Sequence, residues 1–158
     1  MPKIRPCLWF DDRIEEAVNL YVKVFPSAKI LDVSRYGEAG PLEPGKVLTM
    51  IFELEGQEFM ALNGGPQFHF TEAVSFLVNC ESQEEVDHYW NALTADGGEE
   101  SMCGWLKDKF GLSWQIIPSA LMTYLGDPDP GRSQRAMQAM LQMHKIVIAD
   151  LETAAAAA

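Results

Sequence analysis

The sequence predicts an α+β fold made of two tandem modules, in each of which a strand and a helix are followed by three strands. The clearest local signal is the stretch 103–118, where two strand-forming segments flank a turn centred on Gly111. Residues such as Trp114 favour a pleated, half-buried surface, and glycine accepts the positive φ of a tight turn. Pro118 cannot donate to a ladder, so we expect it to end the second strand.

A second copy of this pattern predicts that the chain contains an internal duplication. Met60 occupies in the first copy the place that Gln115 occupies in the second, so one copy has an apolar residue where the other has an amide. Because side chains alternate between the faces of a strand, Gln115 is a single polar group in an otherwise apolar row. The matching segments are 56–62 with 111–117, and 15–21 with 84–90.

The elements of the first module follow from periodicity and from turn residues. Apolar residues at helical spacing between Ile14 and Phe25 predict a helix that Asp11 or Asp12 caps and that Pro26 ends. A Gly- and Pro-rich loop follows at 37–45. We predict strands at 4–10, 28–36, 46–54 and 57–63.

The second module repeats this order and leads into a helical extension. Ser82 and Glu85 form a capping-box pattern ahead of the second helix. The run from Ala154 to Ala158 has no pattern from which a fold can be predicted. We expect a strand at 73–78, the hairpin at 103–118, a helical turn at 119–125 and a helix at 133–143.

The composition limits the partners of the protein. Twelve basic and 23 acidic residues give a net charge of −11, which repels phosphate backbones and anionic lipid, so we expect no nucleic-acid or membrane partner. Three cysteines without CxxC spacing predict free thiols in a reducing cytoplasm. The N-terminus lacks the apolar segment of a signal peptide, so we expect a cytoplasmic protein.

Three segments resemble one known family. The segments 8–11 (Leu-Trp-Phe-Asp), 60–68 (Met-Ala-Leu-Asn-Gly-Gly-Pro-Gln-Phe) and 103–108 (Cys-Gly-Trp-Leu-Lys-Asp) resemble the PhnB-like, or demethylubiquinone methyltransferase-like, family. That family belongs to the glyoxalase, bleomycin-resistance and extradiol-dioxygenase superfamily, which has the vicinal oxygen chelate fold. The resemblance implies two βαβββ modules whose curved mixed sheets surround a cleft, a C-terminal helical extension, and a homodimer. The expected bounds are about 3–65 and 70–118 for the modules and about 119–153 for the extension.

The resemblance also implies where a metal would bind, and these positions do not carry metal ligands. The metal-dependent members use the first and last strand of each module, which correspond here to Met60, Gln115, Arg5 or Pro6, and Ala73 or Ser75. A thioether, an amide and a hydroxyl offer a divalent ion neither charge nor basicity. The three histidines are too far apart in sequence to supply a ligand pair. We therefore predict no metal site and no cofactor.

If the strands pair as the resemblance implies, an apolar cleft with few polar anchors forms the site for a small-molecule ligand. Gln115 is the expected hydrogen-bonding anchor, and Trp105 is a possible stacking surface. The candidate ligand-binding residues are Leu8, Phe10, Met60, Leu62, Ser75, Leu77, Cys103, Trp105, Gln115 and Ile117. Core packing is the alternative for the same residues.

Three functions remain open from the sequence. The first is a metal-independent small-molecule-binding protein or enzyme, whose catalytic residues and substrate the sequence does not identify. The second is a metal-dependent lyase, isomerase or dioxygenase with an unusual ligand set, such as Gln115 with His69. The third is a drug-sequestering protein of the resistance type. A methyltransferase is not expected, because the chain lacks a Gly-rich strand-to-helix turn for a methyl donor.

Overall fold

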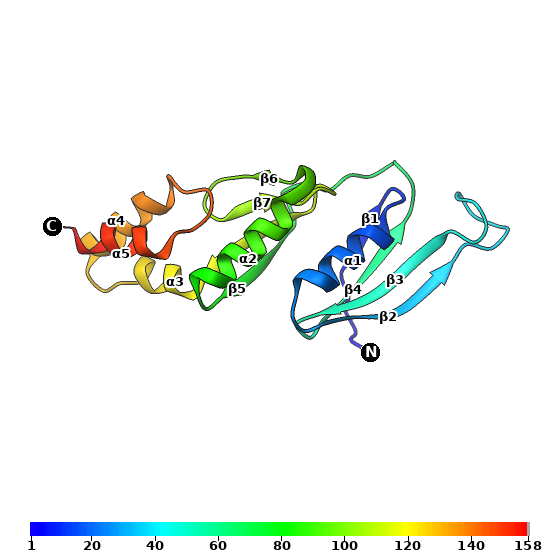
Figure 1. The fold of residues 1–158 in the computed structure, drawn as a ribbon, viewed down its shortest axis with the longest axis horizontal. Coiled ribbons are helices and arrows are strands. Elements are labelled where there is room, and N and C mark those ends of the chain that lie inside the picture. The colour runs from blue at the N-terminus through cyan, green and yellow to red at the C-terminus, as the bar shows by residue number, and fades with distance from the viewer. Residues whose placement is uncertain (158) are drawn as a thin grey trace. The chain divides into compact units, whose positions relative to one another are not determined.

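The computed structural model describes residues 1–157 and divides into two compact units, Met1–Phe70 and a second that begins at Thr71 (Figure 1). The first unit contains β1 (Cys7–Phe10), α1 (Ile14–Val24), β2 (Ala28–Arg35), β3 (Val47–Leu54) and β4 (Gln57–Asn63). The second contains β5 (Ser75–Cys80), α2 (Gln83–Thr94), a 3-10 turn (Ala95–Gly97), β6 (Glu99–Glu100), β7 (Trp105–Lys107) and β8 (Ser113–Pro118). Three further helices follow: α3 (Ser119–Leu125), α4 (Pro130–Met140) and α5 (Ile148–Ala156).

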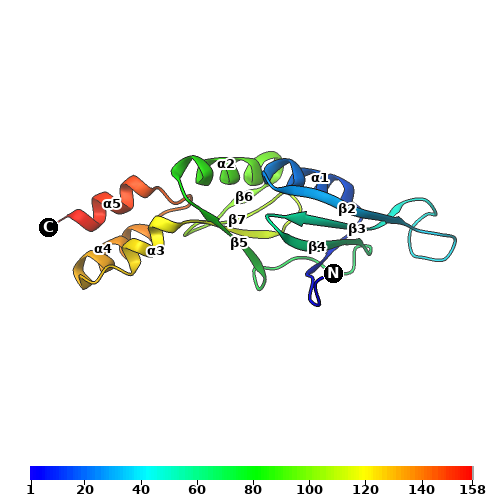
Figure 2. The same ribbon diagram turned by 90° about the horizontal axis from the view of Figure 1, so that it is seen from below.

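The predicted duplication is confirmed in the topology of the two sheets. Their strand orders are β1-β4-β3-β2 and β5-β8-β7-β6, so the first strand of each unit pairs with the last. That pair is parallel in both units, and the remaining pairs are antiparallel. In each unit one helix, α1 or α2, lies on one face of the sheet (Figure 2). Each unit is therefore a βαβββ module, as the sequence predicts.

A buried asparagine, which the sequence pattern did not single out, links α1, β3 and β4 in the first unit. Asn63, which ends β4, is buried; its Oδ1 accepts from the Ile14 N–H at 3.1 Å and its Nδ2 donates to the Val47 carbonyl at 2.9 Å. The amide at the start of α1 thus finds its acceptor on β4, and the predicted cap from Asp11 or Asp12 is wrong, since the side chain at the N-cap makes no cap hydrogen bond. Tyr21 on α1 packs on Phe52 of β3, with ring centroids 6.2 Å apart.

The hairpin of the second unit is held by one buried carboxyl group. Asp108, which is 2% exposed, lies between β7 and β8. Its Oδ1 accepts from the N–H groups of Phe110 and Leu112, at 2.9 and 3.1 Å, and its Oδ2 accepts from Trp114 Nε1 at 3.0 Å. Gly111 has the positive φ of 85° that the sequence predicts for the turn. The predicted cap of α2 is also confirmed, because Ser82 Oγ accepts from the Glu85 N–H at 3.2 Å.

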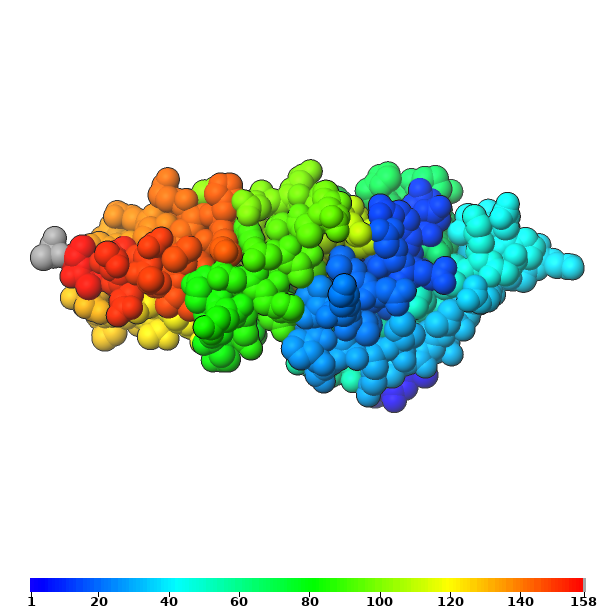
Figure 3. Space-filling model, in the orientation of Figure 1, coloured from blue at the N-terminus to red at the C-terminus, as the bar shows by residue number. Residues whose placement is uncertain are grey.

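The three C-terminal helices form an extension that belongs to the second unit and packs on its βαβββ module. Its core is a cluster of Ile117, Leu121, Ile146 and Leu151. The side chain of Gln83 on α2 donates to the Ile146 carbonyl and accepts from the Ile148 N–H. In the space-filling view, the orange and red residues of the extension pack directly against the green residues of α2 (Figure 3).

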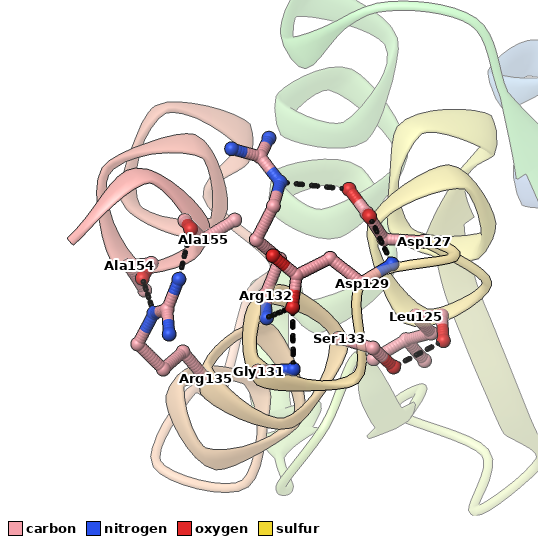
Figure 4. Close-up of polar contacts among 9 residues, drawn as sticks. All are labelled: Leu125, Asp127, Asp129, Gly131, Arg132, Ser133, Arg135, Ala154 and Ala155. Atoms are coloured by element: carbon pink, nitrogen blue, oxygen red, sulfur yellow. Dashed lines mark hydrogen bonds and ion pairs between the residues drawn. The ribbon is translucent and has the colours of Figure 1, made fainter. Parts of the chain in front are cut away.

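The second and third helices of the extension differ from the prediction, whereas α3 agrees with it. Helix α4 begins three residues before the predicted start, because Asp129 accepts from the N–H groups of Gly131 and Arg132 and Pro130 takes the first helical position. The expected helical extension ended at about residue 153 and had no separate helix at the position of α5, which continues through Ala154–Ala156. Arg135 donates to the carbonyls of Ala154 and Ala155, at 3.2 and 2.8 Å, and so satisfies carbonyls in the last turn of α5 (Figure 4).

None of the helices within residues 1–157 has both the length and the apolar character that a membrane span requires.

Candidate functional site

The face of the second sheet that lies opposite α2 brings together five of the predicted site residues. In the sheet register Gln115 stands between Leu77 on β5 and Trp105 on β7. Because paired residues share a face and every second residue returns to it, Ser75 and Ile117 lie on the same side. We call this surface, with Ser75, Leu77, Trp105, Ser113 and Gln115, the open face.

Gln115 has a defined partner on the open face. Its Nε2 donates to Ser75 Oγ at 2.9 Å, across the parallel pair of β5 and β8. This bond fixes the orientation of the Gln115 amide group, including its Oε1. Leu77 is 51% exposed beside it, and Trp105 is half-buried on the other side. An oriented amide between an exposed aliphatic side chain and an indole ring suits recognition of a small amphipathic molecule.

Two predicted residues at the edge of this region belong to the packing of the extension. Ile117 is 8% exposed and packs against Leu121, Ile146 and Leu151, so it is part of a core cluster. Cys103 precedes β7 in a turn, with a φ of 60°, and its N–H donates to the Met143 carbonyl at 2.7 Å. Neither residue lies beside Gln115 in the register of the sheet.

The four predicted residues of the first unit do not share one face, which corrects the sequence-based expectation. Cys7 pairs with Met60 in the parallel register, and Trp9 pairs with Leu62. Leu8 and Phe10 therefore point to the opposite side, which is the side on which α1 packs against β3, and they are 6% and 4% exposed. Met60 and Leu62 are half-buried on the side without α1. Leu8 and Phe10 are core residues, and only Met60 and Leu62 remain candidates here.

Ser113 is a polar residue of the open face that the sequence analysis did not select. It pairs with Ser75 on one side and with Lys107 on the other. It is 1% exposed, and its Oγ has no hydrogen-bond partner among residues 1–157. Its position two residues before Gln115 on the same strand is the signal from which the alternation of faces could have identified it.

An ion pair borders this end of the open face. Lys107 Nζ contacts Glu72 Oε1. The hydrogen bond from Lys107 lowers the pKa of the Glu72 carboxyl, and the same bond raises the pKa of the Lys107 ammonium. Both groups are charged at neutral pH, and their charges compensate each other at the surface.

The positions that would hold the metal of the superfamily do not fit a divalent ion. Gln115 directs its N–H, and not its oxygen, toward Ser75, and Arg5 is a cation paired with Glu58. Met60 lies beside Cys7, an exposed residue whose thiol is partly desolvated. This desolvation raises the pKa of the thiol, which is therefore protonated at neutral pH. No cluster of three His, Cys, Asp or Glu side chains with the geometry of a metal site occurs within residues 1–157.

The repeated βαβββ modules define the class of the protein, because this arrangement is shared with structures of the glyoxalase and bleomycin-resistance fold. A FosX structure from Listeria monocytogenes, described as a genomically encoded fosfomycin resistance protein complexed with Mn(II) and sulfate, has a TM-score of 0.52 at 16% identity over 79% of this chain and 97% of that one. Protein PA1353 from Pseudomonas aeruginosa gives 0.62 at 20% identity over 75% and 98%. At these identities the likeness concerns the fold alone.

The particular family follows from the sequence match. The profile described as 3-demethylubiquinone-9 3-methyltransferase matches residues 2–117, and the chain belongs to this PhnB-like family. A PhnB protein from Bacillus cereus is 38% identical, with a TM-score of 0.69, over 75% of this chain and 100% of that one. Among proteins with curated descriptions, none matches this chain. The family match ends within β8, so α3, α4 and α5 lie beyond it.

Proposed function

We propose that the protein is a metal-independent small-molecule-binding protein or enzyme, whose ligand binds on the open face of the second sheet. The observation that carries this proposal is the pairing of Gln115 with Ser75, which orients an amide beside the exposed side chain of Leu77 and the indole of Trp105. A polar group fixed within an apolar surface is typical of a specific ligand site.

A screen of small molecules against the 158-residue protein tests this proposal. Binding is followed by the thermal shift and by NMR signals of the Trp105 indole. Since Gln115 is the anchor, we expect Gln115→Ala to weaken any compound bound on this face by about three- to tenfold. Gln142→Ala, in the segment after α4, is the matched control. Ligands that perturb residues remote from the open face and are insensitive to Gln115→Ala would contradict the proposal.

A metal-dependent lyase, isomerase or dioxygenase is the second candidate, favoured by one observation. The FosX structure of similar fold contains Mn(II), at 16% identity to this chain. The donor chemistry of Met60, Gln115 and Ser75 favours the metal-independent proposal. Elemental analysis before and after dialysis against a chelator separates the two: a near-stoichiometric ion whose removal lowers the melting temperature would support metal-assisted chemistry. A drug-sequestering role would appear in the same screen as tight binding without turnover.

We also propose that the protein is a homodimer in the cytoplasm. Family membership supports the dimer, and three free thiols, Cys7, Cys80 and Cys103, suit a reducing compartment. Light scattering on the protein as it leaves a size-exclusion column measures its mass directly. A mass near the 17.6 kDa of one chain at micromolar concentration would refute the dimer.

A further inference from the structure

The proposed function gives no role to the side-chain hydroxyl of Ser113, which is buried without a hydrogen-bond partner among the described residues. A hydroxyl that is withdrawn from water and lacks a partner is less stable than a paired one, so such groups are rare and each one calls for an explanation, such as a missing water, ion or ligand. Ser113 Oγ is unpaired among the described residues, at 1% exposure of its residue. It lies on the same face as Gln115, two residues earlier on β8.

The groups around Ser113 indicate what kind of molecule would complete it. Ser75 Oγ already accepts from Gln115 Nε2, so its own O–H remains available to donate. The Ser113 O–H is a second donor, without a partner among the described residues, but it is buried, so a ligand reaches it only when the atoms that cover it move. The Oε1 of Gln115 is an acceptor. This end of the open face therefore presents two donors and one acceptor on neighbouring strands. A carbonyl oxygen, which has two lone pairs, matches the two donors.

The charges at this end favour an uncharged molecule. Glu72 compensates the ammonium group of Lys107, so an incoming anion has no free cation to meet there. The chain as a whole carries a net charge of −11, which opposes binding of an anion. The same ion pair compensates the Glu72 carboxylate, so that carboxylate offers an incoming cation little attraction. Leu77 and Trp105 supply apolar surface for the rest of the molecule.

We propose that the ligand of the open face is an uncharged amphipathic molecule whose carbonyl oxygen accepts hydrogen bonds from Ser75 and Ser113 while its apolar body packs on Leu77 and Trp105. This inference rests on the proposed function and names its ligand class. Ser113 then acts as a determinant of specificity, because it distinguishes a carbonyl compound from a hydrocarbon of the same shape. An ordered water on Ser113 is the competing explanation.

Four probes with a common phenyl ring test the inference on the full chain. Acetophenone, ethylbenzene, benzoate and benzylamine present a ketone, a hydrocarbon, an anion and a cation. Each is titrated to its solubility limit while the Trp105 indole and the Gln115 amide are followed by NMR. We expect acetophenone to bind about three- to tenfold more tightly than ethylbenzene, as one added hydrogen bond allows, and more tightly than both ions.

The variant Ser113→Ala gives the decisive comparison. It removes an unpaired hydroxyl, so it is expected to fold, and its melting temperature verifies this. Acetophenone affinity should fall to that of ethylbenzene, whose own affinity should not change. Ser119→Ala, which removes a hydroxyl bonded to Glu81 near the start of α3, is the matched control and should change neither affinity.

The failures of the two proposals are distinguishable. If probes bind at Trp105 and Gln115 without preference for the ketone, the ligand class is wrong. If Ser113→Ala leaves the preference intact, Ser113 is not the donor to the carbonyl. Either result overturns the inference. The binding site would then still stand. If no probe shifts these signals, the open face is not a binding surface, and the proposed function is refuted with the inference.

Discussion

Replacing Asp108 by alanine should destabilise the second unit more than any change of a surface acid. The substitution removes the acceptor of three N–H groups: Phe110, Leu112 and the indole of Trp114. Leu112 and Trp114 are buried, at 2% and 3% exposure, so water does not replace the lost partner easily. Two buried donors at about 1–3 kcal/mol each give an expected loss of about 4 kcal/mol in the free energy of unfolding.

Asp108→Asn separates the contribution of the two backbone hydrogen bonds from that of the bond with the Trp114 indole. An asparagine oxygen can still accept from the two backbone N–H groups, but its NH₂ group faces the Trp114 N–H, so we expect a loss of about 1–3 kcal/mol. Asp129→Ala is the matched control, because Asp129 also accepts from two backbone N–H groups but is exposed. That cap should contribute about 1 kcal/mol.

Urea denaturation followed by tryptophan fluorescence measures these differences. Three of the four tryptophans, Trp90, Trp105 and Trp114, belong to the second unit, so the signal reports mainly on that unit. Equal losses for Asp108→Ala and Asp129→Ala would show that burial of the hairpin carboxyl does not set its contribution. The argument from desolvation would then be refuted.

Three further predictions concern other parts of the chain. Burial raises the pKa of Cys80 to about 12, so at pH 8 a thiol reagent should label exposed Cys7 and leave Cys80 unmodified until the protein unfolds, as mass spectrometry would show. Since this folded-state pKa lies above the ordinary value, the thiol favours the fold below about pH 9 and loses that contribution as the pH rises toward 12. Gly64→Ala places a methyl group 2.3 Å from an indole atom, and should cost about 1–3 kcal/mol in a thermal melt, whereas Gly37→Ala, in open space, should cost much less. Arg135→Ala removes two hydrogen bonds from the end of α5, and limited proteolysis should then remove the C-terminus faster than in the unaltered protein.

The parts of the fold that the sequence predicted are those that local chemistry determines. The turn at Gly111, the cap at Ser82 and the strand Gln57–Asn63 each depend on residues within a few positions of one another. The start of α1 was mispredicted because its acceptor, Asn63, lies 49 residues away along the chain. Alanines 154–156 contribute no periodic pattern, and their burial depends on the helices that pack against α5.

The sheet face of each candidate residue was predicted correctly where the strand alternates and wrongly where it does not. Strand β8 places a polar residue within an apolar row, so Gln115 could be assigned to a face with its neighbours Ser75 and Leu77. Strand β1, Cys-Leu-Trp-Phe, is apolar throughout, and the face of each residue is fixed only by the parallel register with β4. That register is a tertiary property, which is why Leu8 and Phe10 were placed on the wrong side.

Because of the extension, the shortest stable form of this protein ends beyond residue 117, where the family match ends. A chain cut at residue 117 would lose the Met143 and His144 carbonyls that accept from the N–H groups of Cys103 and Gly104. It would also leave Ile117 without the side chains of its cluster. The end of the family match therefore lies inside a unit that folds cooperatively. A shortened protein designed from the alignment alone would divide that unit.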